Sequence, residues 1–216
     1  FSKKNNIINV GVRAYNGKDF AINKWSATIS AIDKAIPEYQ FRMIPIVSID
    51  DMEKAVKNKI VDFVLSNPTT YVSLEYNFGV SRIATLKNLR IKGGITHFSG
   101  VIFTKANRND INSIEDVVGK KIMGVHKKAF GAWLMQLKEF RSNDIYPLKQ
   151  SSVLFSPDKT MKTIVSSVLD ETVDIGLVRT GLIEKLVSQN KLQFSDLKVI
   201  NQKKDSFPLV HSTALY

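Results

Sequence analysis

Residues 61–71, Val-Asp-Phe-Val-Leu-Ser-Asn-Pro-Thr-Thr-Tyr, constrain the fold more than any other stretch of the chain. The first five residues are a short apolar run of the length of a buried strand. Ser66 and Asn67 are helix-capping residue types, and Pro68 suits the first helical position, where a missing N–H costs nothing. The stretch therefore predicts a strand, a tight turn and a helix that stops at 77–79.

A turn of this kind presents backbone N–H groups, hydroxyls and a phenol at the carboxyl end of a strand. Open α/β sheets bind ligands at that edge, and a helix N-terminus there favours anions. The alternative is a capped helix without a ligand, and this stretch taken alone favours that alternative.

The same order of strand, loop and helix is repeated over the first third of the chain. Apolar runs predict strands, and residues such as Trp25, Ile29 and Ile32 recur at helical spacing. The predicted order is strand 7–13, helix 25–36, strand 39–46, a helix capped by Ser48 or Asp50, strand 61–65 and helix 68–78. This βαβαβα order is typical of a parallel sheet with crossover helices.

A second series of elements follows a turn at Gly93 and Gly94. The predicted elements are strands 81–86, 96–104, 121–125 and 173–178, helices 113–119, 130–140 and 182–187, a helix opening at Ser156-Pro157, and a return segment after 197. The doubled rhythm predicts two α/β lobes rather than one long sheet. We expect residues 1–95 with the tail 191–216 in one lobe and 96–190 in the other, with a cleft between lobes as a preferred place for a small ligand.

Composition excludes several classes of protein. The 216 residues include no cysteine, so no disulfide, thiol nucleophile or cysteine-based metal site is expected. The formal net charge is +11, but the densest lysine clusters are only pairs, so nucleic-acid binding is the weakest reading of that charge. Attraction to an anionic ligand or surface, or plain solubility, explains the positive net charge better than nucleic-acid binding does. No apolar run has the length of a membrane helix, and the opening without Met indicates an excised fragment.

The chain shows no catalytic signature. His97, His126 and His211 stand alone, and no serine lies in the Gly-x-Ser-x-Gly context of a hydrolase. Carboxylate pairs and a phosphate-binding glycine loop are absent as well. We therefore expect no catalytic residue, no metal and no cofactor, and we predict a binding module rather than an enzyme.

Several loops at predicted strand ends carry groups that hold a small polar or anionic molecule. A guanidinium group donates two parallel hydrogen bonds to an oxyanion, and small residues let a ligand come close to the backbone N–H groups. For Arg179 the alternative is an ion pair with Glu184 or Asp174, and for the aromatic residues it is a place in the core. The candidate ligand-binding residues are Arg13, Tyr15, Ser66, Asn67, Thr70, Tyr71, Phe130, Gly131, Ala132, Arg179 and Thr180.

Collinear segments over nearly the whole chain resemble a known family. Besides 61–72, the matching segments are 12–18 with Trp25, 81–85, 100–103, 114–120, 129–133, 173–181 and 207–216. Together they resemble phosphonate-binding-like periplasmic domains, and in particular those that serve as sensor domains of membrane histidine kinases of the tetrathionate-sensor type. Asn67-Pro68 stands where phosphonate importers have Gly-Pro, which favours the sensor branch. Ala132 stands where sensors usually have glycine, and its methyl group narrows the approach to the backbone.

The resemblance implies a type II periplasmic-binding-protein fold, in which two hinged α/β lobes close on a ligand. It also implies export to the periplasm, with a tether to the inner membrane and a kinase beyond a membrane helix that this stretch lacks. The expected partner is a small anionic solute, no nucleic acid is expected, and a homodimer of the full-length receptor is left open.

Two functions stay open at this point. One is a sensor domain whose closed form binds a sulfur, phosphorus or arsenic oxyanion and passes the lobe angle to a kinase. The other is a free solute-binding protein that feeds a phosphonate or oxyanion importer. An enzyme of the same fold is a third and weaker alternative.

Overall fold

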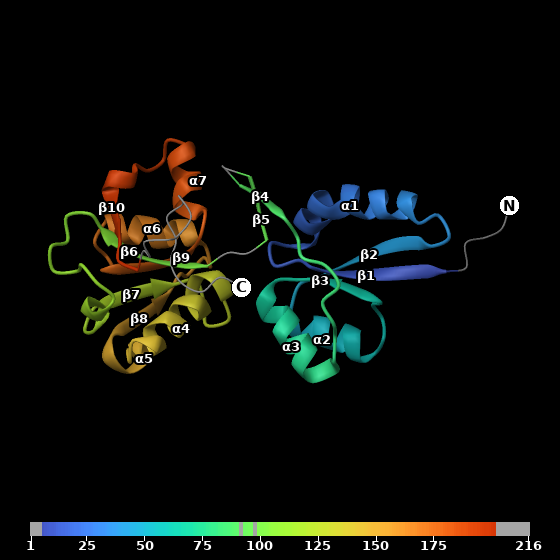
Figure 1. The fold of residues 1–216 in the computed structure, drawn as a ribbon, viewed down its shortest axis with the longest axis horizontal. Helices are drawn as coiled ribbons and strands as arrows, with labels where there is room; N and C mark the ends of the chain where they lie inside the picture. Colours follow the sequence, from blue (N-terminus) through green and yellow to red (C-terminus); the bar gives the residue numbers. More distant parts are fainter. Residues whose placement is uncertain (1–5, 91–92, 97–98, 202–216) are drawn as a thin grey trace. The chain divides into compact units, whose positions relative to one another are not determined.

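The computed structural model describes residues 6–90, 93–96 and 99–201 (Figure 1). The chain divides into two compact units, Phe1–Ile83 and Ala84–Tyr216. Each has its own sheet and its own apolar core, and each is described by itself.

The first unit is a three-stranded parallel sheet between two helical layers. Its elements are β1 (Ile7–Arg13), α1 (Lys18–Ala35), β2 (Gln40–Ile46), α2 (Ile49–Lys57), β3 (Phe63–Leu65) and α3 (Pro68–Phe78). The strand order is β2-β1-β3, and both pairings of β1 are parallel, as the βαβαβα pattern predicts. Helix α1 covers one face of the sheet, and α2 and α3 cover the other (Figure 1).

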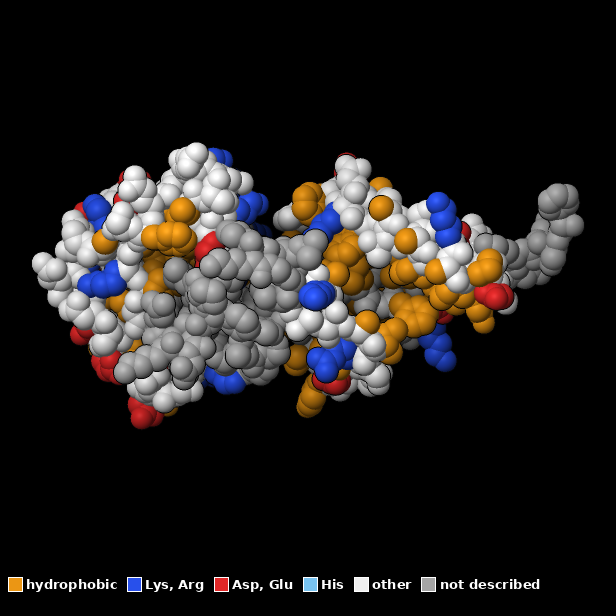
Figure 2. All heavy atoms as spheres, turned by 45° about the horizontal axis from the view of Figure 1, so that its top comes forward, with side chains coloured by type: hydrophobic (Ala, Val, Ile, Leu, Met, Phe, Trp, Pro, Cys, Tyr) orange, Lys and Arg blue, Asp and Glu red, His pale blue; other side chains and the backbone are white. Residues whose placement is uncertain are grey.

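Side-chain alternation along β1 explains these layers. Val10, Val12 and Ala14 pack with Ala21 and Ile29 of α1. The opposite face packs against a separate cluster that contains residues of α2 and α3. Helix α1 buries few of its residues, and hydrophobic side chains gather on the face of the first unit that Figure 2 displays. The first unit therefore has a modest core for its size.

The second unit is built on a five-stranded mixed sheet in the order β10-β6-β9-β7-β8. Its elements are β4 (Asn88–Arg90), β5 (Gly93–Ile95), β6 (Gly100–Lys105), η1 (Glu115–Val117), β7 (Lys121–Gly124), η2 (Phe130–Leu134), α4 (Met135–Ser142), α5 (Pro147–Gln150), β8 (Ser152–Phe155), α6 (Met161–Leu169), β9 (Ile175–Arg179), α7 (Leu182–Ser188), η3 (Phe194–Asp196) and β10 (Leu197–Val199). Strands β7, β8 and β9 are parallel, whereas β6 runs antiparallel to β9 and β10.

Two apolar clusters fill the two faces of this larger sheet. One contains Phe103 with residues of α6 and α7, and the other contains Trp133 and Phe140 from the segment 130–142. Trp133 packs edge-on against Phe155 with ring centroids 5.1 Å apart. The second unit thus has the better-developed core of the two.

Several element predictions differ from the structure. Residues 81–86 form no strand, and Ile83 is 78% exposed, because apolar residues in an extended segment make a strand only where a neighbouring strand is available to pair. The helix predicted from Ser156 begins instead at Met161. Asp158 accepts a hydrogen bond from Ser156 Oγ at 2.6 Å, Lys159 has φ of 55°, and Thr160 caps the helix. The loop therefore continues for three residues past Ser156-Pro157.

The end of the described chain lies on the second sheet. We expected residues from 191 onward to belong with the first lobe, yet Leu197–Val199 pair with β6, and Leu197 is buried in the core that contains Phe103. The compact first unit also ends at Ile83 rather than at residue 95. The return segment 207–216 lies outside the described residues.

Candidate functional site

The carboxyl ends of β1, β2 and β3 meet at one edge of the first sheet because the three strands are parallel. Arg13 is the last residue of β1, opposite Ile46 of β2. Val12 lies opposite Leu65, and α3 begins three residues after Leu65. The edge therefore combines a guanidinium group with the N-terminus of an 11-residue helix.

The turn into α3 has the predicted cap. Asn67 Oδ1 accepts a hydrogen bond from Thr70 N–H at 3.0 Å, and Pro68 occupies the first helical turn. Within the described residues, Ser66 Oγ donates one hydrogen bond, to Asn67 O at 3.3 Å. The prediction that Asn67 or Ser66 caps this helix is confirmed, with Asn67 as the capping residue. The side-chain oxygen of Asn67 is thereby engaged by its own helix.

Arg13 is half-buried and poorly bonded. Its only hydrogen bond within the described residues runs from Nη1 to Ile46 O at 3.4 Å, and its Nε is buried without a partner. Burial lowers the pKa of the guanidinium, an effect that the nearby Tyr15 phenol partly opposes. The Nε atom is therefore desolvated without a compensating hydrogen bond from the described residues.

The other predicted residues of this edge differ in exposure. Tyr15 is 60% exposed, whereas Thr70 is fully buried and its Oγ1 has no partner among the described residues. Tyr71 is half-buried, and its hydroxyl donates to Glu75 Oε1 at 2.5 Å. This hydrogen bond raises the pKa of the Tyr71 phenol. Thr70 and Arg13 thus have unused hydrogen-bonding groups, while the hydroxyl of Tyr71 is engaged.

In the second unit, the segment predicted to open a helix with small residues is a turn of π-helix. It spans Phe130–Leu134 and continues into α4, with Ala132 at φ −129° and ψ 29°. Gly131 and Ala132 are buried, and Ala132 O accepts a hydrogen bond from Val125 N–H at 3.2 Å. Turns of π-helix frequently mark functional sites.

Sequence reasoning missed Gln136, which ties this turn to the sheet. Its fully buried Nε2 lies 2.9 Å from Gly131 O, 2.8 Å from Val178 O and 3.3 Å from Val101 O. One amide thereby holds the π turn against the strand that ends at Arg179. A glutamine on the otherwise apolar face of 130–140 was the available signal, but its partners are distant in sequence.

Arg179 and Thr180 lie where β9 ends, as the sequence predicts. Arg179 is half-buried opposite Gly100 of β6. The Thr180 hydroxyl contacts Ser99 N at 3.1 Å, Ser99 O at 3.0 Å and Ser99 Oγ at 3.0 Å. These contacts use its donor and both acceptor positions, so the hydroxyl fixes the start of β6.

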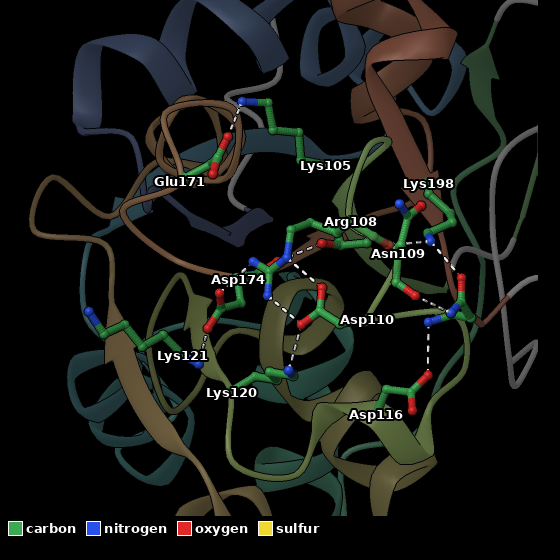
Figure 3. Close-up of polar contacts among 12 residues, drawn as sticks. Lys105, Arg108, Asn109, Asp110, Asp116, Lys120, Lys121, Glu171, Asp174 and Lys198 are labelled. Carbon is green, nitrogen blue, oxygen red and sulfur yellow. Dashed lines mark hydrogen bonds and ion pairs between the residues drawn. The ribbon is translucent and has the colours of Figure 1, made fainter.

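Asp174 is not available as a partner of Arg179. It precedes β9 at the opposite end of the strand and accepts a hydrogen bond from Arg108 Nη1 at 2.5 Å (Figure 3). Arg108 also makes a two-pronged pair with Asp110 at 2.7 and 2.8 Å, and Lys120 reaches Asp110 at 2.7 Å. This network ties the loop 105–120 to the sheet edge away from Arg179, which is a structural role.

The described residues hold no group of three or more His, Asp or Glu side chains that would bind a metal ion. No described helix combines the length and hydropathy needed to span a bilayer. His126 is exposed, and its Nδ1 accepts the Lys128 N–H at 3.0 Å. His97 and His211 lie outside the described residues.

The predicted site residues therefore form two sets. One set lies at the carboxyl edge of the first sheet, and Gln136 brings the members of the other set together in the second unit.

A family model for periplasmic phosphonate substrate-binding proteins of ABC transporters matches residues 10–214. The chain belongs to this family. Its fold is the α/β type II periplasmic-binding-protein fold, and the domain is a substrate-binding module rather than an enzyme.

One curated relative is the tetrathionate sensor histidine kinase TtrS of Salmonella typhimurium. It is 21% identical over 208 residues, which are 96% of this chain. The chain spans only 35% of the length of that relative.

Solved structures share the fold at low sequence identity. A Xanthomonas citri protein bound to ATP has a TM-score of 0.70 at 14% identity, covering 90% of this chain and 72% of that one. PhnD1 of Prochlorococcus marinus in complex with methylphosphonate has a TM-score of 0.56 at 15% identity, with coverage of 90% and 71%. These likenesses establish the fold alone.

Proposed function

We propose that this domain is the extracytoplasmic sensor of a two-component histidine kinase and that it binds a small anionic solute between its two lobes. The observation that carries the proposal is the likeness to a sensor kinase over 96% of this chain. In this proposal a membrane helix tethers the domain to the inner membrane, and the kinase lies in the remainder of the full-length protein.

The proposed ligand site joins the two sets of residues. Arg13, Tyr15, Ser66, Asn67, Thr70 and Tyr71 would contact the ligand from the first lobe, and Phe130, Gly131, Ala132, Arg179 and Thr180 would contact it from the second. Two features support an anion: guanidinium groups at strand ends in both units and the N-terminus of α3.

Signalling follows from differential affinity. A ligand that contacts both lobes binds the closed form more tightly than the open form, and so it shifts the balance toward closure. The tethered kinase would read that change. Small-angle scattering with and without ligand tests this step, because closure lowers the radius of gyration, and an unchanged radius at saturation contradicts it.

The binding proposal is tested on residues 1–216 with a panel of anions. Tetrathionate, methylphosphonate, sulfate and phosphate would each be added while the melting temperature is followed. A ligand at 100 times its Kd adds about 2.7 kcal/mol to the stability of the folded state. Sodium chloride at equal ionic strength is the control for screening. A melting temperature that no member of the panel raises above this control contradicts the anionic part of the proposal.

The second candidate is a free solute-binding protein of a phosphonate or oxyanion importer. The family match over residues 10–214 favours it, because that family consists of transporter components. The gene distinguishes the two functions. A membrane helix and a kinase encoded after Tyr216 support the sensor, and a stop codon close behind it supports the free binding protein.

A further inference from the structure

The side chain of Gln136 lies between two segments of the second unit, the π turn 130–134 and the end of β9. Gln136 is the second residue of α4, and its side chain is fully buried. Its Nε2 lies 2.9 Å from Gly131 O in the π turn and 2.8 Å from the carbonyl oxygen of Val178, which directly precedes Arg179. One amide group therefore contacts the main chain of both segments, although they come from different elements.

The glycine that begins β6 makes room for this amide. Gly100 is the first residue of β6 and lies opposite Arg179 of β9. A Cβ atom on Gly100 would overlap Cδ and Nε2 of Gln136. The amide also lies 3.3 Å from Val101 O of the same strand. It therefore occupies the space that a side chain on β6 would take, beside the pair of residues at the end of β9.

The π turn is attached to the remaining central strand by its own main chain. The Val125 N–H donates to Ala132 O at 3.2 Å, and a Cβ atom on Gly124 would lie 3.0 Å from the same oxygen. This bond ties the turn to the end of β7, whereas Gln136 ties it to β6 and β9. The spacing between the turn and the end of β9 therefore depends on Gln136.

Stability alone does not account for an amide at this position. Its Nε2 has two hydrogens for the three nearby carbonyl oxygens, and its Oε1 is buried without a hydrogen-bond partner among the described residues. A buried oxygen without a donor costs free energy, and an apolar side chain of similar shape avoids that cost. Local costs of this kind are retained where a group serves a function.

We infer that Gln136 is a positioning residue, which presets the spacing between the π turn and the end of β9 and thereby raises the affinity for the ligand without contacting it. The inference rests on the proposed solute-binding function and specifies how the second unit is preorganised. A ligand that contacts residues 130–132 and Arg179 together binds more tightly when both are already in place, because less conformational freedom is lost on binding. Residues behind a site that lock its geometry act in this way.

Two test variants remove this contact from opposite sides. Gln136→Met keeps the length and approximate shape of the side chain but has no N–H donor. Gly100→Ala leaves Gln136 unchanged and displaces its amide through the added methyl group. The control is Val168→Ala, which removes buried apolar volume from α6 in the same unit. Urea unfolding verifies that each variant of residues 1–216 is folded.

Trp133 reports the position of the π turn in the ligand-free protein. It lies within the turn, is buried and packs edge-on against Phe155. The chain has two tryptophans, so Trp25→Phe serves as the background for fluorescence. We expect both test variants to shift the Trp133 emission to longer wavelength and to increase its quenching by acrylamide. The control should change neither, whereas a purely structural role of Gln136 predicts lower stability with an unchanged signal from the folded state.

Calorimetric titration measures the effect on affinity, with tetrathionate, methylphosphonate, sulfate and phosphate as probes. For whichever probe binds the wild type, both test variants should raise Kd at least about 10-fold, which corresponds to about 1.4 kcal/mol. The control should change Kd less than about 2-fold.

A combination of the two sites tests whether Gly100→Ala acts through the amide. A Gln136→Ala protein has no amide to displace, so adding Gly100→Ala to it should leave Kd unchanged. An undiminished effect of Gly100→Ala in that background contradicts the inference.

The outcomes separate this inference from the proposed function. Wild-type affinity of Gln136→Met for a bound probe overturns the inference and leaves solute binding intact. An unshifted Trp133 emission in both test variants overturns it as well. If no probe binds the wild type, the anionic part of the proposed function falls, and the Trp133 measurement alone decides the inference.

Discussion

Arg179 ends β9 beside the π turn that Gln136 holds against the same strand. We predict that Arg179→Ala weakens binding of the proposed ligand by about 2–5 kcal/mol, because it removes a charge-assisted bidentate contact from a desolvated site. Lysine at this position should restore only part of the affinity, because it keeps the charge without the planar fork. Titration of a bound anion into both variants measures the effect, after urea unfolding has verified that each is folded. Wild-type affinity in Arg179→Ala would remove this residue from the site.

Gly176, the second residue of β9, is required for packing. A Cβ atom there would overlap Phe103 Cζ and would lie 3.0 Å from Ile164 Cγ2, and both of those side chains are fully buried. We expect Gly176→Ala to lower the free energy of unfolding by about 1–3 kcal/mol through overpacking. Urea denaturation measures this loss. Adding Phe103→Leu to the same protein should cost less than the two single changes together, and strict additivity would argue against the clash.

At the scale of elements, α3 depends on its cap. Asn67→Ala removes the acceptor of the Thr70 N–H and should lower the free energy of unfolding by about 1 kcal/mol. Asn67→Asp should retain stability, since a carboxylate accepts the same bond and suits the positive end of the helix dipole. Ser66→Ala is the matched control because Ser66 Oγ donates to Asn67 O and accepts no backbone N–H from the described residues. The midpoints of urea unfolding measure these changes in stability. A loss of stability in Ser66→Ala as large as that in Asn67→Ala would contradict the assignment of Asn67 as the cap.

At the scale of the whole molecule, acid should destabilise the protein through the network in Figure 3. Hydrogen bonds from Arg108 and Lys120 hold the pKa of Asp110 well below its ordinary value. The pKa of Asp174 is also lowered. Burial acts against this lowering, but the Lys121 N–H and Arg108 outweigh it. The folded state therefore binds fewer protons than the unfolded state as the pH falls through the unfolded pKa, so this stability is complete at neutral pH and lost in acid.

We expect the free energy of unfolding to decline as the pH is lowered from about 5 toward 2, a range that spans the unfolded aspartate pKa of about 3.9 and extends below it. Asp110→Asn should make this decline shallower, because the group that titrates has been removed. Asp144→Asn, at an exposed position of the same unit, should leave the slope unchanged. Urea unfolding at a series of pH values measures both slopes. Equal slopes for the wild type and Asp110→Asn would show that Asp110 does not carry the acid sensitivity.

Sequence patterns predicted the features that depend on residues close together in the chain. The alternation of strand and helix predicted that β1, β2 and β3 belong to a parallel sheet, and Asn67-Pro68 predicted the start of α3. Patterns did not predict the mixed sheet of the second unit or the pairing of 197–199 with β6, because pairing depends on partners distant in the chain. The strand predicted at 81–86 was wrong for the same reason.

For the candidate site, too, the sequence predicted local features and the tertiary structure determined the rest. The sequence alone indicated that Arg13, Thr70 and Arg179 follow or flank buried strands, because residue type and position are properties of a segment. Only the tertiary structure revealed that Arg13 Nε and Thr70 Oγ1 are buried without partners among the described residues, and that Asp174 is engaged by Arg108. It also revealed Gln136, whose contacts with residues 101, 131 and 178 join three segments. Burial and hydrogen-bond satisfaction depend on which groups the folded chain brings together, and the order of residues along the chain does not contain that information in local form.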